Sequence, residues 1–181
     1  MAEHESEFRS LFRLKKEKGR EEKEILLLGY RVGEQCYATR IPYIKEILRI
    51  PTLYSMPQVP SFVKGVMDLR GVILPVIDLK ERLGLGPVTD RKGRVVVMVF
   101  DRRHIGLLVD SVLEVFPARP SEVKASPEVF NQPHMGYLEG MIRKGDILYL
   151  VLNPGSVLTD KEMKALDASD LESLMLRGGG E

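Results

Sequence analysis

Two carboxylates are the residues of this 181-residue sequence best suited to acid–base chemistry. Asp78 and Asp110 are the candidates, because paired carboxylates carry much hydrolytic chemistry. Asp78 also has a structural explanation, since Asp78-Leu79-Lys80-Glu81 has the pattern of a helix capping box. In that motif Asp78 accepts a backbone N–H and Glu81 reaches back. The sequence therefore favours a structural role for Asp78 over a catalytic one.

Metal and covalent chemistry have little support. The histidines, His4, His104 and His134, have no carboxylate or thiol around them at metal-ligand spacing, so we expect no metal site. Cys36 sits in a predicted strand, where a thiol is more often a small core residue than a nucleophile. The sequence also has no nucleophile elbow, zincin helix or Walker-type loop. These observations predict a protein that is not an enzyme and needs no cofactor.

Net charge and chain length limit the kinds of protein that this sequence can encode. The chain has 27 Lys and Arg against 26 Asp and Glu, a net charge of +1, which argues against a general binder of nucleic-acid backbones. Its length allows one domain with tails or two small domains. A single cysteine and the lack of an apolar leader predict the reducing cytosol. The apolar runs are too short to span a bilayer, so we expect only indirect membrane association.

Strands joined by tight turns must position any site. Short runs of β-branched and aromatic residues separated by turn residues predict three hairpins, at residues 25–41, 94–109 and 137–152. A C-terminal helix is predicted to begin at Thr159 or Asp160 and to run to about Arg177, before a disordered tail.

The first 24 residues form a charged extension rather than core. A basic run from Arg13 to Arg20 lies within it. This run leaves open an alternative function, in which a small-barrel protein binds nucleic acid. Such binding would depend strongly on salt, and the near-neutral net charge and few aromatics speak against it.

Aligning the chain with itself shows an internal repeat. At an offset of 68, residues 38–47 fall on residues 106–115, and at an offset of 75, residues 62–83 fall on residues 137–158. Matched positions keep their size and polarity, which predicts a duplicated β unit. Asp78 falls on Asn153, which caps a helix equally well. We therefore expect Asp78→Asn to leave folding nearly intact.

Folding alone does not explain Arg70 and Glu46. Arg70 lies beside a glycine in Asp68-Leu69-Arg70-Gly71, just before an apolar strand. Glu46 lies among apolar residues in Ile44-Lys45-Glu46-Ile47-Leu48. A charged residue beside β-branched ones is the composition of a binding patch with an apolar centre and a polar rim.

The run Gly65-Val66-Met67-Asp68-Leu69-Arg70-Gly71-Val72-Ile73-Leu74-Pro75-Val76-Ile77-Asp78-Leu79 resembles the signature segment of the CheW-like family, the chemotaxis coupling proteins. Three further segments, residues 106–115, 137–140 and 148–167, follow in the family's order and spacing. The resemblance covers about residues 25 to 170.

The resemblance implies a mainly β fold of two tandem five-stranded SH3-like barrels with short helices and a C-terminal helix. Residues 25–90 would form mostly the first barrel and residues 91–158 mostly the second, with an exchange of strands left open. Residues 159–181 would add the helix and tail to a domain that spans residues 25–170.

The implied function is that of a non-catalytic cytoplasmic adaptor. It would couple the cytoplasmic tips of methyl-accepting chemoreceptors to the regulatory domain of a CheA-like histidine kinase, and would meet the membrane only through receptors. A coupling protein of a non-chemotactic array that controls gliding or pili would have the same sequence features.

Matching positions imply which residues act. Ile44, Glu46 and Arg70 would contact the receptor or the kinase, and Val66 and Val112 would lie on neighbouring faces. Gly65 and Gly71 would hold the loop geometry. The family usually has Asn where this chain has Asp68, whose added charge is expected to pair with Arg70 and weaken its contact with a partner.

Overall fold

The computed structural model describes residues 22–125, 136–167 and 171–173. The basic run from Arg13 to Arg20 lies outside these residues, as do His4, His134 and the predicted disordered tail. None of the helices in the described part of the chain is long and apolar enough to cross a bilayer.

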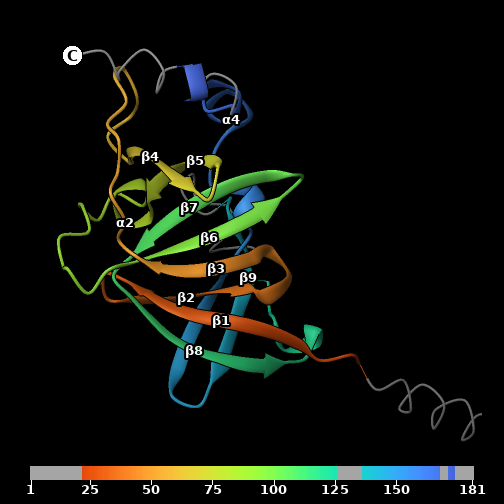
Figure 1. The fold of residues 1–181 in the computed structure, drawn as a ribbon. Helices are drawn as coiled ribbons and strands as arrows, with labels where there is room; N and C mark the ends of the chain where they lie inside the picture. The colour runs from red at the N-terminus through yellow and green to blue at the C-terminus, as the bar shows by residue number, and fades with distance from the viewer. Residues whose placement is uncertain (1–21, 126–135, 168–170, 174–181) are drawn as a thin grey trace, which may run out of the picture.

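Strands make up most of the described chain (Figure 1). They are β1 (Ile25–Val32), β2 (Gln35–Arg40), β3 (Ile44–Arg49), β4 (Val63–Leu69), β5 (Val72–Asp78), β6 (Arg94–Phe100), β7 (Arg103–Val109), β8 (Ser111–Ala118), β9 (Leu138–Lys144) and β10 (Ile147–Leu152). The helical segments are short: η1 (Ile41–Tyr43), α2 (Leu79–Arg82), η2 (Pro120–Glu122), η3 (Pro154–Ser156) and α4 (Asp160–Ala165). The mainly β fold and the three predicted hairpins are confirmed.

The strands form two five-stranded sheets, each curled into a barrel. One sheet has the order β8-β1-β2-β10-β9, and we call it the outer barrel; the other has the order β3-β6-β7-β5-β4, and we call it the central barrel. The barrels are stacked on one another (Figure 1). Bridges between Lys124 and Met141 and between Tyr54 and Val66 connect the end strands β9 and β4 to chain that follows β8 and β3.

The sequence repeat maps onto the strands in a crossed manner. Its offsets place β3 on β8, β4 on β9 and β5 on β10. Each barrel takes a leading hairpin from one copy, β1–β2 or β6–β7, and three strands from the other copy. Each barrel therefore combines strands from both sides of residue 90, and neither can close without both copies of the repeat.

The core has three parts because strands such as β1 are buried on both faces. Leu27 packs inside the outer barrel, whereas Leu28 and Tyr30 on the opposite face join a large cluster that draws on strands of both barrels. A third cluster fills the central barrel. Alternate residues of a strand point to opposite faces, so the continuous apolar run at the start of β1 reflects this two-sided burial.

The C-terminal helix is shorter than predicted. Thr159 caps α4 and Glu162 completes a capping box, as the sequence indicates, but the helix ends at Ala165 because the backbone of Leu166 leaves the helical region. A separate helical segment covers residues 171–173. Met163, Leu166 and Leu171 are all buried in the cluster between the barrels. The turn after Ala165 thus lets the chain place these apolar side chains against one core. Leu174 and Met175 of the predicted apolar face lie outside the described residues.

Two buried tyrosines should make the fold sensitive to alkali. Burial raises the pKa of Tyr37 to about 12, and burial together with the neighbouring Glu114 carboxylate raises the pKa of Tyr149 to about 12. The neutral phenols are therefore favoured by folding, and this contribution is complete below the ordinary value of 10.0 and lost as the pH rises towards 12. We expect the free energy of unfolding to fall across this range. Urea titrations at a series of pH values should show a smaller fall for Tyr149→Phe, and an identical fall would contradict this assignment.

Candidate partner-binding site

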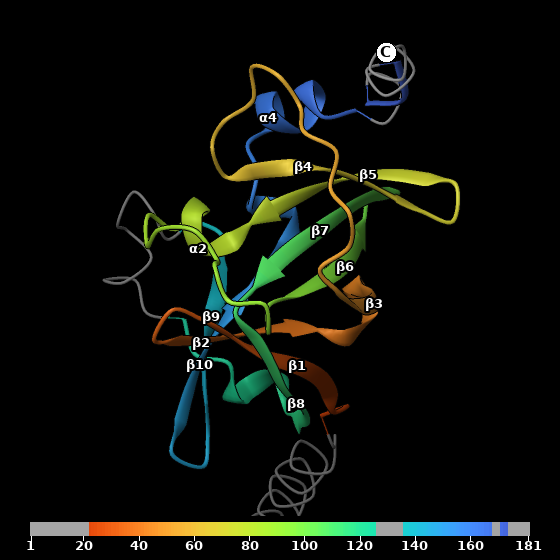
Figure 2. The ribbon, with the colours of Figure 1, turned by 60° about the vertical axis from the view of Figure 1, so that its left-hand side comes forward.

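Arg70 lies at the tip of the β4–β5 hairpin, which projects from the central barrel (Figure 2). Arg70 and Gly71 form the two-residue turn and both have positive φ, 50° and 89°. This is the backbone conformation of a tight hairpin turn whose twist matches that of the strands. Asp68 supports the turn because its Oδ1 accepts the backbone N–H of Gly71 at 2.7 Å.

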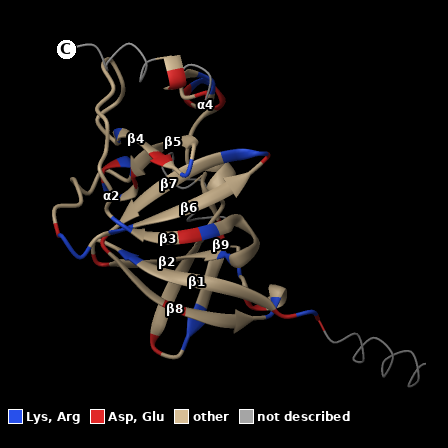
Figure 3. Cartoon of the chain, viewed as in Figure 1, with Lys and Arg blue, Asp and Glu red and all other residues tan. Residues whose placement is uncertain are grey.

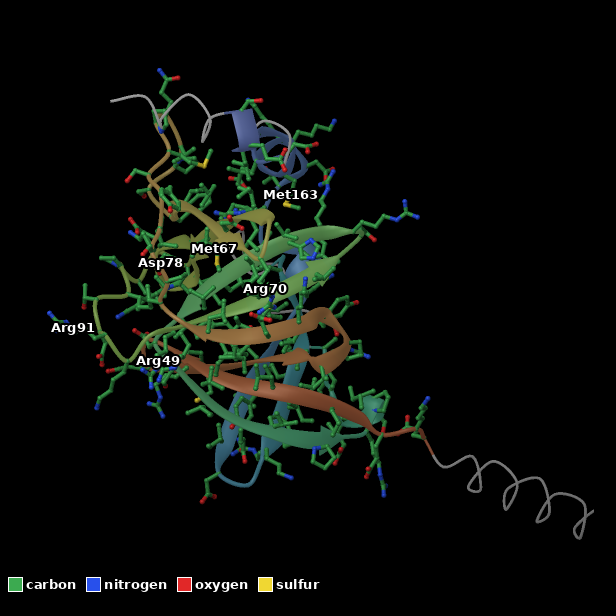
Figure 4. All side chains as sticks on the ribbon, in the orientation of Figure 1. Arg49, Met67, Arg70, Asp78, Arg91 and Met163 are labelled. Atoms are coloured by element: carbon green, nitrogen blue, oxygen red, sulfur yellow. The ribbon has the colours of Figure 1, made fainter. Side chains whose placement is uncertain are left out.

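Arg70, which Figure 4 labels, forms an ion pair with Glu46 of β3, so the structure brings these two predicted residues together. The Arg70 side chain remains 70% exposed, and that of Glu46 is 23% exposed. The expected pairing of Asp68 with Arg70 is not found, since the carboxylate of Asp68 is turned to the Gly71 N–H. The side-chain carbonyl of an asparagine would accept the same hydrogen bond. Having Asp68 where the family usually has Asn therefore leaves the turn geometry unchanged.

Stability is a weak explanation for the Arg70–Glu46 pair. An exposed ion pair contributes about 0 to 1 kcal/mol. Placing a residue other than glycine in the left-handed region costs about 1 to 2 kcal/mol. The ion pair therefore offsets this cost at most in part. The net effect is a guanidinium held by a carboxylate on a rigid turn, with most of its surface free for another molecule.

Ile44 and Val112 occupy equivalent positions in the repeat. Both are partly buried and pack against the cluster between the barrels, from the starts of β3 and β8. Each side chain therefore has an apolar surface that is only partly covered within the chain.

Val66 and Gly65 differ from their expected placements. Val66 is 2% exposed and belongs to the core, so it has no surface with which to contact a partner. Gly65 lies inside β4 rather than in a loop, at an irregularity in its pairing with β5. Its φ is 143°, and a Cβ there would overlap the carbonyl oxygen of Tyr54. Gly65 is thus required by a close approach of two backbones.

Exposed apolar residues that the sequence did not single out lie along β3, β8 and β1. Ile47 of β3 is 41% exposed and Val115 of β8 is 54% exposed. On β1, the neighbour of β8, Leu26 is 48% exposed. Ile47 and Val115 are matched by the repeat, so the signal for them was present in the sequence. It was missed because apolar residues in strands are usually assigned to the core.

Asp78 is a structural residue of the central barrel. It is fully buried, its Oδ1 accepts the N–H of Glu81 at 3.1 Å, and its Oδ2 accepts the N–H of Val88 at 2.8 Å. Glu81 does not reach back as a capping box requires, because the N–H of Asp78 is donated to Phe62. Glu81 pairs with Lys64 instead, and this hydrogen bond lowers the pKa of its carboxyl.

Asp110 fastens the junction of β7 and β8 to the outer barrel. Its Oδ2 accepts the N–H of Gly33 at 2.6 Å in the β1–β2 turn, and its Oδ1 lies 3.7 Å from the Nζ of Lys80. Its own N–H is donated to Arg31. Asp78 and Asp110 therefore bind different backbone groups in different places, and the geometry does not support their use as a hydrolytic pair.

Comparisons with known proteins agree with this arrangement. Residues 26–162 match the family described as the CheW-like domain. The chain is 25% identical over 150 residues to a chemotaxis protein CheW of Treponema pallidum. This match covers 80% of this chain and 88% of that protein. It is 29% identical over 141 residues to a chemotaxis protein CheW of Klebsiella aerogenes, and this match covers 77% of this chain and 85% of that protein.

A solved structure has the same fold. The crystal structure of the scaffolding protein TtCheW from Thermoanaerobacter tengcongensis superposes with a TM-score of 0.71 at 24% identity, over 80% of this chain and 94% of that one.

Proposed function

The chain belongs to the CheW-like domain family, and we propose that it is a non-catalytic coupling protein of a chemosensory signalling array. Its partners would be the cytoplasmic tips of chemoreceptors and the regulatory domain of a CheA-like histidine kinase. The names of its relatives, chemotaxis protein CheW, support this proposal. It would act in the cytoplasm and reach the membrane only through the receptors.

The observation that carries the proposal is the exposed guanidinium of Arg70, held by Glu46 on a rigid hairpin turn. Arginine is enriched at interfaces because its planar fork binds carboxylates in a fixed geometry and loses little freedom when it is already positioned. The partly buried Ile44 lies on the same strand as Glu46 and packs against the cluster between the barrels. Together they have the composition of a small interface with an apolar centre and a charged margin.

Coupling places a thermodynamic demand on this surface. A protein that binds both partners transmits a signal only if its contacts differ in free energy between the kinase-on and kinase-off arrangements. An arginine that exchanges an internal carboxylate for a partner's carboxylate would supply such a difference. We propose that Arg70 makes this exchange, with Glu46 as its resting partner.

The test is co-sedimentation with receptor-bearing membranes and a CheA-like kinase, with kinase phosphorylation measured in the same samples. We expect Arg70→Glu to weaken binding by at least about tenfold, since it replaces an attraction with a repulsion at an interface. Glu46→Ala should have a smaller effect because Arg70 is kept. Arg143→Glu, in the equivalent hairpin of the outer barrel, makes the same charge change at an exposed position and should bind normally.

A charge-swapped variant separates an internal role of the pair from an external one. Arg70→Glu combined with Glu46→Arg restores an ion pair within the chain but presents the wrong charge to the partner. Continued loss of binding by this folded variant would support a direct contact. Wild-type binding by the Arg70→Glu variant would contradict the proposal.

A further inference from the structure

A second charged surface lies where β3 ends and β6 begins. Arg49 is the last residue of β3 and Arg94 the first of β6, and the register of the two strands places them directly opposite each other. Arg91 and Lys92 lie in the loop just before β6. Figure 3 shows Lys and Arg in blue at this end of β3 and β6, and Figure 4 labels Arg49 and Arg91. We call Arg49, Arg91, Lys92 and Arg94 the basic cluster.

No described carboxylate neutralises the basic cluster through an ion pair. The neighbouring acid, Asp90, uses its Oδ1 to accept the backbone N–H of Lys92 at 2.9 Å. Arg94 is positioned by backbone instead, because its Nη1 donates to the carbonyls of Lys92 and Gly93, each at 2.9 Å. Like charges directly opposite in a sheet are destabilising. The fold therefore keeps an unfavourable arrangement that a negatively charged molecule would relieve.

Apolar residues border the cluster. Ile47 and Ile50 lie on either side of Arg49 in the sequence and are 41% and 39% exposed. The loop before β6 packs against Ile50, since a Cβ on Gly93 would lie 3.0 Å from the Ile50 Cδ1. Exposed isoleucines beside fixed arginines match the mixed character of a protein interface.

We propose that the basic cluster binds an acidic segment of a protein partner, with Arg49 and Arg94 contacting its carboxylates. Guanidinium groups on two neighbouring strands favour carboxylates, which they bind in a bidentate manner. Alternate residues of a strand face opposite ways, so Arg49 and Glu46 lie on different faces of β3. The cluster is therefore a separate surface from the Arg70–Glu46 pair, and the inference stands without the proposed function.

The test uses a fluorescent helical peptide built from Glu, Ala and Leu, and a matched peptide with Gln in place of every Glu. Fluorescence anisotropy of the full chain should show binding of the acidic peptide that weakens as salt is added, and little binding of the Gln peptide. We expect Arg49→Gln combined with Arg94→Gln to weaken binding of the acidic peptide by about tenfold or more.

A matched control is available at the opposite end of β6. Arg102→Gln combined with Arg103→Gln removes the same charge from the tip of the β6–β7 hairpin and should leave peptide binding close to that of wild type. Thermal unfolding adds an independent readout. Loss of the opposed charges at Arg49 and Arg94 should leave the melting temperature unchanged or raise it, whereas a purely structural role would lower it.

Three results would overturn the inference: absence of peptide binding by the wild-type chain, equal binding by the two double variants, or a lowered melting temperature for Arg49→Gln with Arg94→Gln. Vesicles of phosphatidylglycerol and of phosphatidylcholine test the membrane alternative. Loss of phosphatidylglycerol binding in the double variant, with peptide binding kept, would assign the cluster to anionic lipid instead. Receptor and kinase binding in the sedimentation assay can fail or succeed independently of these outcomes.

Discussion

Gly65→Ala is expected to destabilise the protein by at least about 3 kcal/mol, because it combines backbone strain with a steric overlap. Gly65 has a φ of 143°, which an alanine rarely adopts, and its added Cβ would meet the Tyr54 carbonyl well inside 3.0 Å. That carbonyl accepts the N–H of Val66 at 2.9 Å, and the N–H of Tyr54 donates to the Val66 carbonyl at 2.9 Å. The alanine would force apart this bridge beside β4.

Urea unfolding followed by circular dichroism measures the effect. Gly136→Ala is the control, since its added Cβ would meet no atom of the described residues within 4 Å and its φ is not positive, and we expect it to change stability little. Because β4 leads directly to Arg70, Gly65→Ala should also weaken partner binding through the hairpin. Equal stabilities of the two variants would show that the Tyr54 segment yields without cost, contrary to this account.

Asp78→Asn is expected to cost about 2 to 4 kcal/mol of stability, because it leaves a backbone N–H that now bonds to a fully buried carboxylate without its acceptor. The two oxygens of Asp78 accept two different N–H groups, those of Glu81 and Val88, and Lys64 Nζ lies 3.9 Å from Oδ2. An asparagine has one oxygen, so its amide NH₂ would face one of these donors. This reverses the expectation from the sequence, in which the Asn153 of the second repeat implied a neutral change.

Asn153→Asp is the matched control for the cap. Asn153 accepts one bond through its side chain, from the N–H of Gly155 at 3.1 Å, and an aspartate can accept it equally well. Urea unfolding should therefore show a much larger loss for Asp78→Asn than for Asn153→Asp. A loss of less than about 1 kcal/mol in Asp78→Asn would mean that Val88 finds another acceptor or water.

Local patterns were sufficient for three hairpins of this fold and for the start of its C-terminal helix. Strands of β-branched residues ended by Gly33, Asp101 or Gly145 predicted three hairpins, because turn geometry and the two-residue period of a strand act over a few residues. The cap of α4 by Thr159 was visible for the same reason. The internal repeat and the family signature around Arg70 were also properties of the sequence alone.

Only the tertiary structure decided how the repeats share their strands and which site residues meet. The pairing of β3 with β6 and of β8 with β1 depends on contacts far apart in the chain, which no local pattern specifies. The same holds for the ion pair of Arg70 with Glu46, the burial of Val66 and the second acceptor role of Asp78. In each case the deciding atoms come from another strand or loop. The sequence thus determined three hairpins, the helix cap and the family, while packing between the strands of the two barrels determined the surfaces that the protein presents.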